Sequence, residues 1–248
     1  MRTILIAFAL ILTVGQAMAS SEGPELMEAH PDVDNMASLQ NGAKLFMNYC
    51  SGCHSLKYLR YKRLSDDLNI PEKVVEKQLI FSKDHKIGDN MTNAMPADLA
   101  QKWFGKAPPD LTLTARVRGA DWIYTYLNTF YRDDSRIFGV NNLVLPNASM
   151  PHVLWRLQGV PEPVMKEVHS GGGKPKVEVA DVKVPEKGGV MSEEQYHEAT
   201  RDITNFLVYA SEPVKSERRH LGIYVLLFLV ALTFILYLLK KEFWKDVH

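Results

Sequence analysis

Asn48-Tyr49-Cys50-Ser51-Gly52-Cys53-His54 holds both cysteines of this 248-residue chain, three positions apart, with a histidine directly after the second. This spacing is the attachment signature of c-type haem. Two thiols add across the two vinyl groups of one haem, and the histidine that follows supplies the proximal nitrogen ligand of the iron. Ser51 and Gly52 are small, so the turn between the thioethers can lie close to the porphyrin. The stretch therefore predicts one covalently bound haem c, held by Cys50 and Cys53.

Two other interpretations of the cysteines are weaker. A thioredoxin-like dithiol, or an exported disulfide, would leave the adjacent histidine unexplained. A structural zinc site takes four ligands, and the chain has no second cysteine pair. The charges balance, with 29 Lys and Arg against 29 Asp and Glu, so the composition does not suggest a nucleic-acid-binding protein.

The N-terminus has the pattern of a secretory signal peptide over residues 1–19. A charged start precedes the apolar run Ile4–Val14, and Ala17-Met18-Ala19 forms a small-residue cleavage site before Ser20. The run is shorter than the roughly 20 apolar residues that a membrane-spanning helix needs. Export agrees with the haem motif, because bacteria attach haem c outside the cytoplasmic membrane, where a lone dithiol would tend to oxidise.

The C-terminus carries a charge-free stretch, Leu221–Leu239, of the right length to cross a bilayer once. Basic residues lie on both sides of it, so their count does not set the orientation. The signal peptide does: residues 20–213 form an exported body, 214–220 a basic linker into the membrane, and 240–248 a tail in the cytoplasm.

The body begins with a polar, extended lead-in, residues 20–38, and becomes helical from Leu39 into the haem motif. Gly42 and Phe46 share one face of this helix, which predicts a close crossing with a terminal helix. The predicted partner helix begins at Ser192-Glu193-Glu194-Gln195, which resembles a capping box. Apolar residues at helical spacing follow it, namely Tyr196, Ala199, Ile203, Phe206, Leu207 and Ala210.

The segments between these helices carry weaker patterns. Residues 56–64 are basic and aromatic by turns, which indicates a solvated face or, less favoured, a docking surface. Residues 67–81 predict a helix interrupted at Pro71, and 84–96 a loop. Residues 171–189 are rich in glycine and charge with alternating valines, which predicts an exposed hairpin or flap.

An apolar stretch with a rigid proline pair is suited to the wall of a haem pocket, and equally to an ordinary core. It opens with Pro108-Pro109-Asp110-Leu111 and continues with alternating apolar residues to Val117. After Gly119 a helical pattern of large apolar residues follows, made up of Trp122, Ile123, Tyr126, Leu127 and Phe130.

The second axial ligand of the iron is to be found among methionine, histidine and lysine. Met150 is the first candidate, because Pro146-Asn147-Ala148-Ser149-Met150-Pro151 forms a loop before the last helix, and prolines there can hold a sulfur over the iron. Met91 and Met95 lie in another loop and remain alternatives. His152 and Met165 are less favoured.

Together these pieces resemble the cytochrome c1 family, the haem subunits of ubiquinol:cytochrome c oxidoreductase (complex III). The resemblance spans nearly the whole chain after the signal peptide. The matching stretches are Tyr49-Cys50-Ser51-Gly52-Cys53-His54-Ser55-Leu56-Lys57-Tyr58, Pro108-Pro109-Asp110-Leu111, Ala115-Arg116 with Gly119-Ala120-Asp121-Trp122, Thr204-Asn205-Phe206-Leu207 with Ala210-Ser211-Glu212-Pro213, and Arg218-Arg219-His220-Leu221-Gly222.

The resemblance implies a mainly α protein: a class I cytochrome c-like haem domain with long loop insertions, plus one C-terminal transmembrane helix. It gives the distal position on the iron to Met150, opposite His54. It also implies that Arg116 lies near a haem propionate, that Trp122 flanks the same group, and that Pro109 packs on the haem.

The implied function is one-electron transfer within a respiratory chain, with no catalysis by the subunit alone. A Rieske iron-sulfur protein would supply the electron, and a soluble or tethered cytochrome c would accept it. A cytochrome b would be the neighbour in the bacterial inner membrane, with the haem domain on the periplasmic side and the complex a dimer. The alternative is another membrane-tethered monohaem c-type carrier outside complex III.

Overall fold

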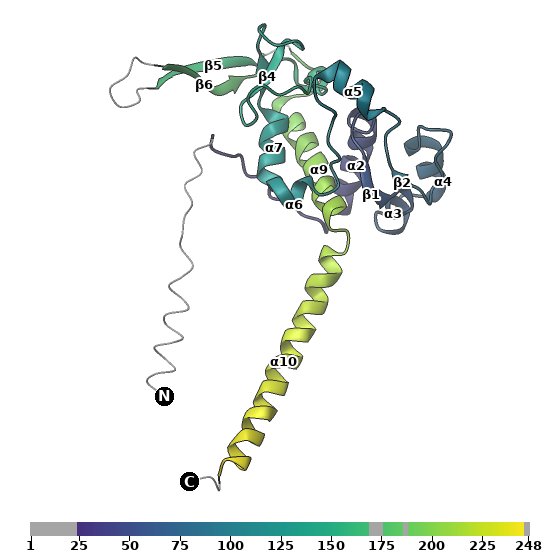
Figure 1. Cartoon of the computed structure of the whole chain (residues 1–248), viewed down its shortest axis with the longest axis vertical. Coiled ribbons are helices and arrows are strands. Elements are labelled where there is room, and N and C mark those ends of the chain that lie inside the picture. Colours follow the sequence, from purple (N-terminus) through teal and green to yellow (C-terminus); the bar gives the residue numbers. More distant parts are fainter. Residues whose placement is uncertain (1–23, 169–175, 186–187, 246–248) are drawn as a thin grey trace.

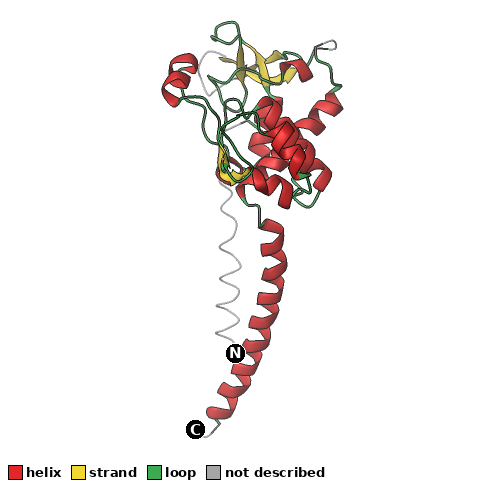
Figure 2. Ribbon diagram, turned by 90° about the vertical axis from the view of Figure 1, so that its right-hand side faces the viewer, coloured by secondary structure: helices red, strands yellow, loops and turns green. Residues whose placement is uncertain are grey.

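The computed structural model describes residues 24–168, 176–185 and 188–245. A mainly helical domain lies at one end of a single long helix, α10, which extends away from it (Figures 1 and 2). The mainly α architecture predicted above is confirmed. The predicted signal peptide, residues 1–19, lies outside the described residues, as does the triple glycine of the predicted hairpin.

The described elements follow one another mostly as short helices with three strand pairs between them. In chain order they are α2 (Met36–Tyr49), β1 (Leu56–Arg60), α3 (Tyr61–Asp66), α4 (Glu72–Val74), the π-helical turn η1 (Val75–Leu79), β2 (Asn90–Met91), α5 (Ala97–Phe104), α6 (Thr114–Arg118), α7 (Ala120–Asn128), β3 (Phe130–Arg132), β4 (Val140–Asn142), α8 (Trp155–Gln158), β5 (Glu162–Val168), β6 (Lys176–Lys183), α9 (Glu193–Ser211) and α10 (Lys215–Phe243). The described strands pair antiparallel as β1–β2, β3–β4 and β5–β6.

The crossing of α2 over α9 forms the centre of the core, as the sequence predicts. Gly42 lies so close to α9 that a Cβ atom built there would be 2.0 Å from the carbonyl oxygen of Asp202. One turn further on, the rings of Phe46 and Phe206 meet with centroids 5.6 Å apart. Both phenylalanines are fully buried. The absence of a side chain at Gly42 therefore sets how closely the two helices approach.

Helix α2 begins at Met36, three residues before the predicted start, because Asn35 caps it. The Asn35 side chain accepts a hydrogen bond from the backbone N–H of Ser38 at 3.1 Å. The hydroxyl of Ser38 in turn donates to the carboxylate of Asp202 at 2.5 Å, and the Asn41 amide donates to the same carboxylate at 2.7 Å. Asp202 is buried, so these bonds replace the water that its charge would otherwise require. They tie the start of α2 to the middle of α9.

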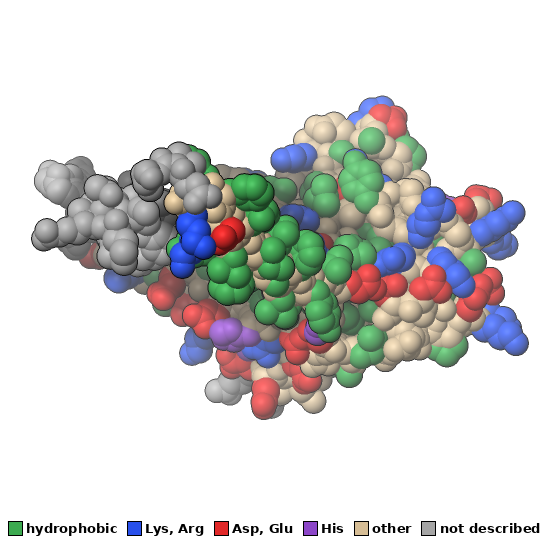
Figure 3. Space-filling model, turned by 90° about the horizontal axis from the view of Figure 1, so that it is seen from below, with side chains coloured by type: hydrophobic (Ala, Val, Ile, Leu, Met, Phe, Trp, Pro, Cys, Tyr) green, Lys and Arg blue, Asp and Glu red, His purple; other side chains and the backbone are tan. Residues whose placement is uncertain are grey.

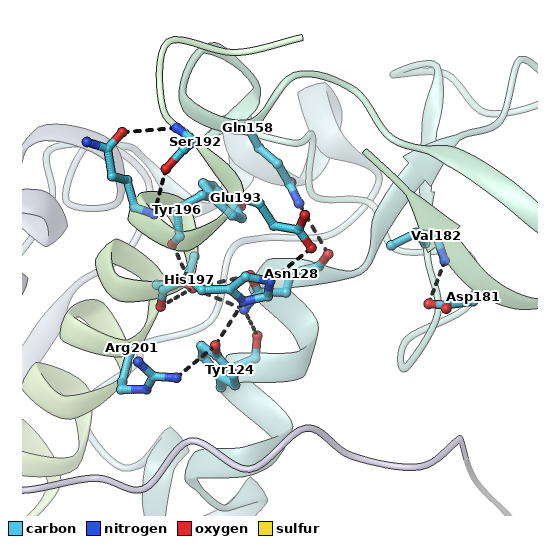
Figure 4. A network of polar contacts seen from close by, with 12 residues as sticks. Tyr124, Asn128, Gln158, Asp181, Val182, Ser192, Glu193, Tyr196, His197 and Arg201 are labelled. Atoms are coloured by element: carbon cyan, nitrogen blue, oxygen red, sulfur yellow. Dashed lines mark hydrogen bonds and ion pairs between the residues drawn. The ribbon is translucent and has the colours of Figure 1, made fainter. Parts of the chain in front are cut away.

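A polar seam joins α7 to α9 on the other side of α9 (Figure 4). The hydroxyl of Tyr196 donates to the carbonyl of Leu127 at 2.8 Å, and the Asn128 amide donates to the Thr200 hydroxyl at 3.0 Å. These groups are buried and each has a hydrogen-bond partner. They therefore fix how α7 and α9 are oriented relative to each other across an otherwise apolar interface. The start of α9 carries the predicted capping box between Ser192 and Gln195, and the predicted apolar stripe is buried throughout.

One prediction for the middle of the chain was wrong in detail. Residues 67–70 are not helical, because Asn69 adopts a positive φ of 53° and the chain turns to bring Leu68, fully buried, into the core. The helical part begins only after Pro71, as α4 and η1. The alternating apolar stretch after Pro109 forms a turn and the short helix α6, on which Val117 is exposed.

The predicted hairpin is present, and its first strand begins earlier than the sequence indicates. Strand β5 pairs with β6 from Glu162 opposite Lys183 to Val168 opposite Lys176, and the hairpin projects from the domain (Figure 1). Its base is fixed by an ion pair of 2.9 Å between Arg132 and Glu162. The basic and aromatic stretch at residues 56–64 becomes β1 and most of α3, with its leucines buried, Lys57 and Arg60 exposed, and Lys62 and Arg63 half-buried.

Helix α10 is long and apolar enough to cross a membrane, and none of its residues is buried by the rest of the chain. It includes the predicted span and also the basic residues 215–220, which form its first turns. Seen from below, hydrophobic side chains gather along α10, whereas charged ones are scattered over the domain behind it (Figure 3). Its charge-free part, Leu221–Leu239, is long enough to span the hydrocarbon core of a bilayer.

Candidate haem-binding site

The haem motif begins where α2 ends, so the helix sets its direction. Cys50 is the C-cap of α2, and its backbone N–H donates to the carbonyl of Phe46 at 2.8 Å. The chain then turns back on itself, because the N–H groups of Cys53 and His54 both donate to the carbonyl of Cys50, at 3.1 and 2.9 Å. This compact turn brings the two thiols and the imidazole to the same end of α2, as the spacing predicts.

Cys50 and Cys53 are not joined by a disulfide, and Cys50 is the more deeply buried of the two. Burial, with a smaller contribution from Cys53, raises the pKa of the Cys50 thiol to about 12. Burial also raises the pKa of Cys53. Zinc binds the thiolate form, which this environment disfavours, and the described residues contain no group of three or more His, Cys, Asp or Glu side chains able to hold a metal. The pair therefore does not fit a structural zinc site, and its spacing ahead of His54 fits the two thioethers of one haem.

The imidazole of His54 is fixed by a carbonyl from a distant loop. Its Nδ1 lies 2.7 Å from the carbonyl oxygen of Pro109. A carbonyl only accepts, so Nδ1 carries the proton and donates, which leaves the Nε2 lone pair free to bind a metal. Burial lowers the pKa of His54, and this also favours the neutral ring that a metal requires.

The loop that carries Pro109 is itself fastened to the chain just after the haem motif. The carboxylate of Asp110 accepts from the N–H of Lys57 at 2.8 Å and from that of Thr112 at 3.0 Å. The N–H of Leu111 donates to the carbonyl of Ser55 at 2.9 Å. Pro109 is expected to pack on the haem. In the structure, its backbone carbonyl is the group that orients His54.

Asn93 is a contributor that the sequence analysis missed. Its side-chain amide donates to the carbonyl of Cys53, and its backbone N–H donates to the Ser55 hydroxyl at 2.9 Å. It therefore holds both sides of His54 from a segment forty residues away. No local pattern singles it out, because it lies in a loop among other polar residues.

Met150 lies half-buried against the core in a loop whose leading half is held by two asparagines. The Asn142 side chain accepts from the N–H groups of Val144 and Leu145 at 3.0 and 3.2 Å. The Asn141 side chain accepts from the N–H of Asn147 at 2.8 Å. These bonds fix the loop before Met150 without regular secondary structure.

His152 fixes the other side of the same loop and is committed to that role. Its ring stacks on Phe130 with centroids 5.0 Å apart, and its Nε2 donates to the carbonyl of Gly159 at 3.1 Å. The side chain is buried, with 4% exposed. Met150 therefore lies between two anchored points, while Nε2 of His152 is occupied by the Gly159 carbonyl.

The burial of His152 predicts a pH dependence of stability. Burial lowers the pKa of His152 to about 4, from 6.5. The unfolded chain then binds more protons between these values, so the free energy of unfolding falls as the pH drops from 6.5 toward 4, by about 3 kcal/mol in all. Urea unfolding of the detergent-solubilised chain at pH 7.0 and 4.5 measures this. His152→Gln should flatten the difference, and His30→Gln, at an exposed position, should keep it; equal slopes in both variants would contradict the assignment.

Arg116 and Trp122, expected beside one haem propionate, each lie near another charged side chain. Arg116 Nη1 lies 3.7 Å from the carboxylate of Glu212 at the end of α9. Trp122 stacks on Tyr126, and the guanidinium of Arg118 lies 5.0 Å from the centre of the Trp122 ring. Gly119, with φ of 90°, separates α6 from α7 and lets Arg118 fold back onto Trp122. The sequence analysis did not identify Arg118 as a contact of Trp122, although the two residues are four positions apart.

The donor set fits a covalently attached haem c. The two neighbouring thiols, the oriented imidazole and the half-buried thioether in a fixed loop have the chemistry that such a group requires. Cys50, Cys53, His54 and Met150 are the residues that would hold it.

Comparison with known proteins places this site in a family. The family model described as "Cytochrome C1 family" matches residues 29–247. A cytochrome c1 from Allochromatium vinosum is 52% identical over all of this chain and all of its own length. A protein from Nitrosomonas europaea named ammonia monooxygenase gamma subunit is 42% identical over 97% of this chain and 96% of its own.

Among solved structures, a chain of a hyperthermophilic respiratory complex III covers 100% of this chain at 16% identity, with a TM-score of 0.48. The family model covers nearly all of the chain after the predicted signal peptide, and the identity to the Allochromatium protein extends from end to end. This chain belongs to the cytochrome c1 family, which implies a c-type haem.

Proposed function

We propose that this chain carries electrons singly in a quinol:cytochrome c reductase, from a Rieske iron-sulfur protein to a cytochrome c. The observation that carries the proposal is the free Cys50–Cys53 thiol pair beside an imidazole whose Nδ1 is bound to the Pro109 carbonyl. The family match and the names of the relatives support the same role. When bound, haem c supplies the one-electron redox change.

The residues of this chain hold and tune the group without breaking a substrate bond. The carbonyl of Pro109 keeps His54 in one tautomer and one orientation, which raises the basicity of its Nε2. Asn93 and Asp110 stiffen the backbone around it. A methionine as second ligand raises the reduction potential relative to a second histidine, and it leaves no open position for oxygen.

Met150 is the distal ligand in this proposal, and the placement of the other methionines supports it. Met91 pairs with Leu56 in the strand that follows His54 and is buried, and the backbone of Met95 is tied to Asn93, which holds Cys53. Both belong to the segment attached to the His54 side of the site. Met165 lies on the exposed hairpin.

The proposed setting is a bacterial inner membrane with the haem domain in the periplasm. Residues 1–19 would be removed after export, residues 20–213 would form the haem domain, and 240–248 would remain in the cytoplasm. Helix α10 would span the membrane beside a cytochrome b, in a dimeric complex. The apolar surface of α10 and the basic residues at both of its ends support this arrangement.

An optical spectrum of the tagged protein, extracted mildly from its own membranes, tests the function. We expect a b-type haem to co-purify and added quinol to reduce the c-type haem in an inhibitor-sensitive way. A c-type spectrum alone that quinol leaves unchanged, in several mild detergents, would replace the proposal by a tethered monohaem carrier outside complex III.

Attachment is tested by Cys53→Ala. Removal of one thiol leaves at most one thioether, so the pyridine haemochrome band should shift toward that of a haem with one free vinyl group, and mass spectrometry should find the haem on Cys50 only. Ser51→Ala, between the cysteines, serves as the control and should keep both thioethers. A doubly attached haem in Cys53→Ala would refute the motif assignment.

A further inference from the structure

The joint between the haem domain and its anchor is short and is built around one carboxylate. Helix α9 ends at Ser211, Glu212 is its C-cap, and α10 begins at Lys215. None of the residues of α10 is buried by the rest of the described chain. The direction in which α10 leaves the domain is therefore decided at this joint.

Glu212 links the two sides of the joint. One carboxylate oxygen accepts from Nε of Arg218 on α10 at 2.5 Å, and the other lies 3.7 Å from Nη1 of Arg116 on α6. The Glu212 side chain is 16% exposed, against 58% and 62% for the two arginines. The hydrogen bond from Arg218, with the nearby positive charges, lowers the pKa of Glu212, so the carboxylate is charged at neutral pH.

The position of this charge is unfavourable for α9 on its own. The C-terminus of a helix carries a partial negative charge, so an acid there is destabilising and a base stabilising. The guanidinium groups of Arg116 and Arg218, which lie outside α9, offset this unfavourable interaction and stabilise the carboxylate of Glu212. The neighbouring Arg219 and Glu217 make no ion pair within the described part of the chain, so the pairing is particular to these three residues.

The joint connects to the haem motif through packed helices. Helix α9 crosses α2 at Gly42 with no room for a side chain, and α2 runs directly into Cys50. Cores packed this closely move as rigid bodies. A tilt of α9 relative to α10 is then passed on to the motif.

We propose that Glu212 is a positioning residue, which joins α6 and α10 through Arg116 and Arg218 and so fixes the tilt of the haem motif above the membrane. This inference rests on the proposed function in naming a haem as the group that is positioned and a membrane as the place where α10 is anchored. The ion pairs of Glu212 are a property of the chain whether or not it binds a haem.

Glu212→Gln in the intact membrane complex tests the proposal, with Glu217→Gln, five residues away, as the matched control. The glutamine side chain has the same size as glutamate and keeps one oxygen acceptor, but it carries no charge. Trypsin added from the haem-domain side should cut after Lys215, Arg218 or Arg219 roughly fivefold faster in Glu212→Gln, because cleavage requires the first turns of α10 to open. The control should be cut at the wild-type rate, and the urea unfolding midpoint of the domain should not change.

Linear dichroism of the c-type haem in oriented membranes gives the second readout. Glu212→Gln and Arg218→Gln should both broaden or shift the haem orientation, and Glu217→Gln should not. Wild-type cleavage and orientation in Glu212→Gln, or equal changes in the control, would overturn the proposal. If the wild-type protein carries no haem, the proposed function fails, and the cleavage rates still decide whether the joint depends on Glu212.

Discussion

Gly42→Ala is expected to destabilise the domain by about 3 kcal/mol or more, although alanine is the better helix former. In an open helix the change would stabilise by about 1 kcal/mol. Here the new Cβ would lie 2.0 Å from the Asp202 carbonyl oxygen and 2.8 Å from Cβ of Phe206. The first of these is backbone of α9, held by the helix, so it cannot turn away as a side chain would. The two helices must separate, and this breaks the contact between Phe46 and Phe206.

Urea unfolding of the detergent-solubilised chain measures the loss, and the covalent haem content of the purified variant measures its effect on the site. Gly88→Ala is the matched control, because a Cβ atom there would meet nothing within 4 Å. We expect the control to stay within about 0.5 kcal/mol of the wild type. If Gly42→Ala is as stable as Gly88→Ala, the close crossing does not support the fold in the way described.

Met150→Leu is expected to keep the covalent haem while lowering its reduction potential by on the order of 0.1 V, within the range of about 0.8 V that axial ligands span. Leucine conserves the volume and the packing against the core but has no sulfur to offer. The distal position then opens, and the reduced protein should bind carbon monoxide. A redox titration and the carbon monoxide difference spectrum of the intact complex measure the two effects.

Met95→Leu is the control for this experiment, because it removes a half-buried thioether from the loop that Asn93 ties to the haem motif. It should leave the potential and the carbon monoxide spectrum unchanged. An unchanged potential in Met150→Leu, or a larger effect in Met95→Leu, would move the distal ligand to the other loop.

The sequence by itself determined the features that depend on spacing along the chain. The haem motif is set by three neighbouring positions, the capping box by Ser192 and Gln195, and the terminal anchor by an unbroken apolar run. The crossing at Gly42 was also predictable, since a small residue followed one turn later by a large one indicates a close helix contact. Local patterns contain this information because the motif, the capping box and the anchor each form within one segment of chain, and the crossing is marked by two residues one turn apart on α2.

Only the tertiary structure decided which distant groups meet. The Pro109 carbonyl that orients His54 lies 55 residues away from it, and the amide of Asn93 reaches Cys53 over 40 residues. The structure also shows that Arg116 lies near the carboxylate of Glu212 and that the guanidinium of Arg118 lies over the ring of Trp122. Hydrogen bonds and ion pairs of this kind depend on the path of the chain in space. A pattern of residue types along the sequence does not specify that path, because the same polar residue is equally suited to a solvent-exposed loop.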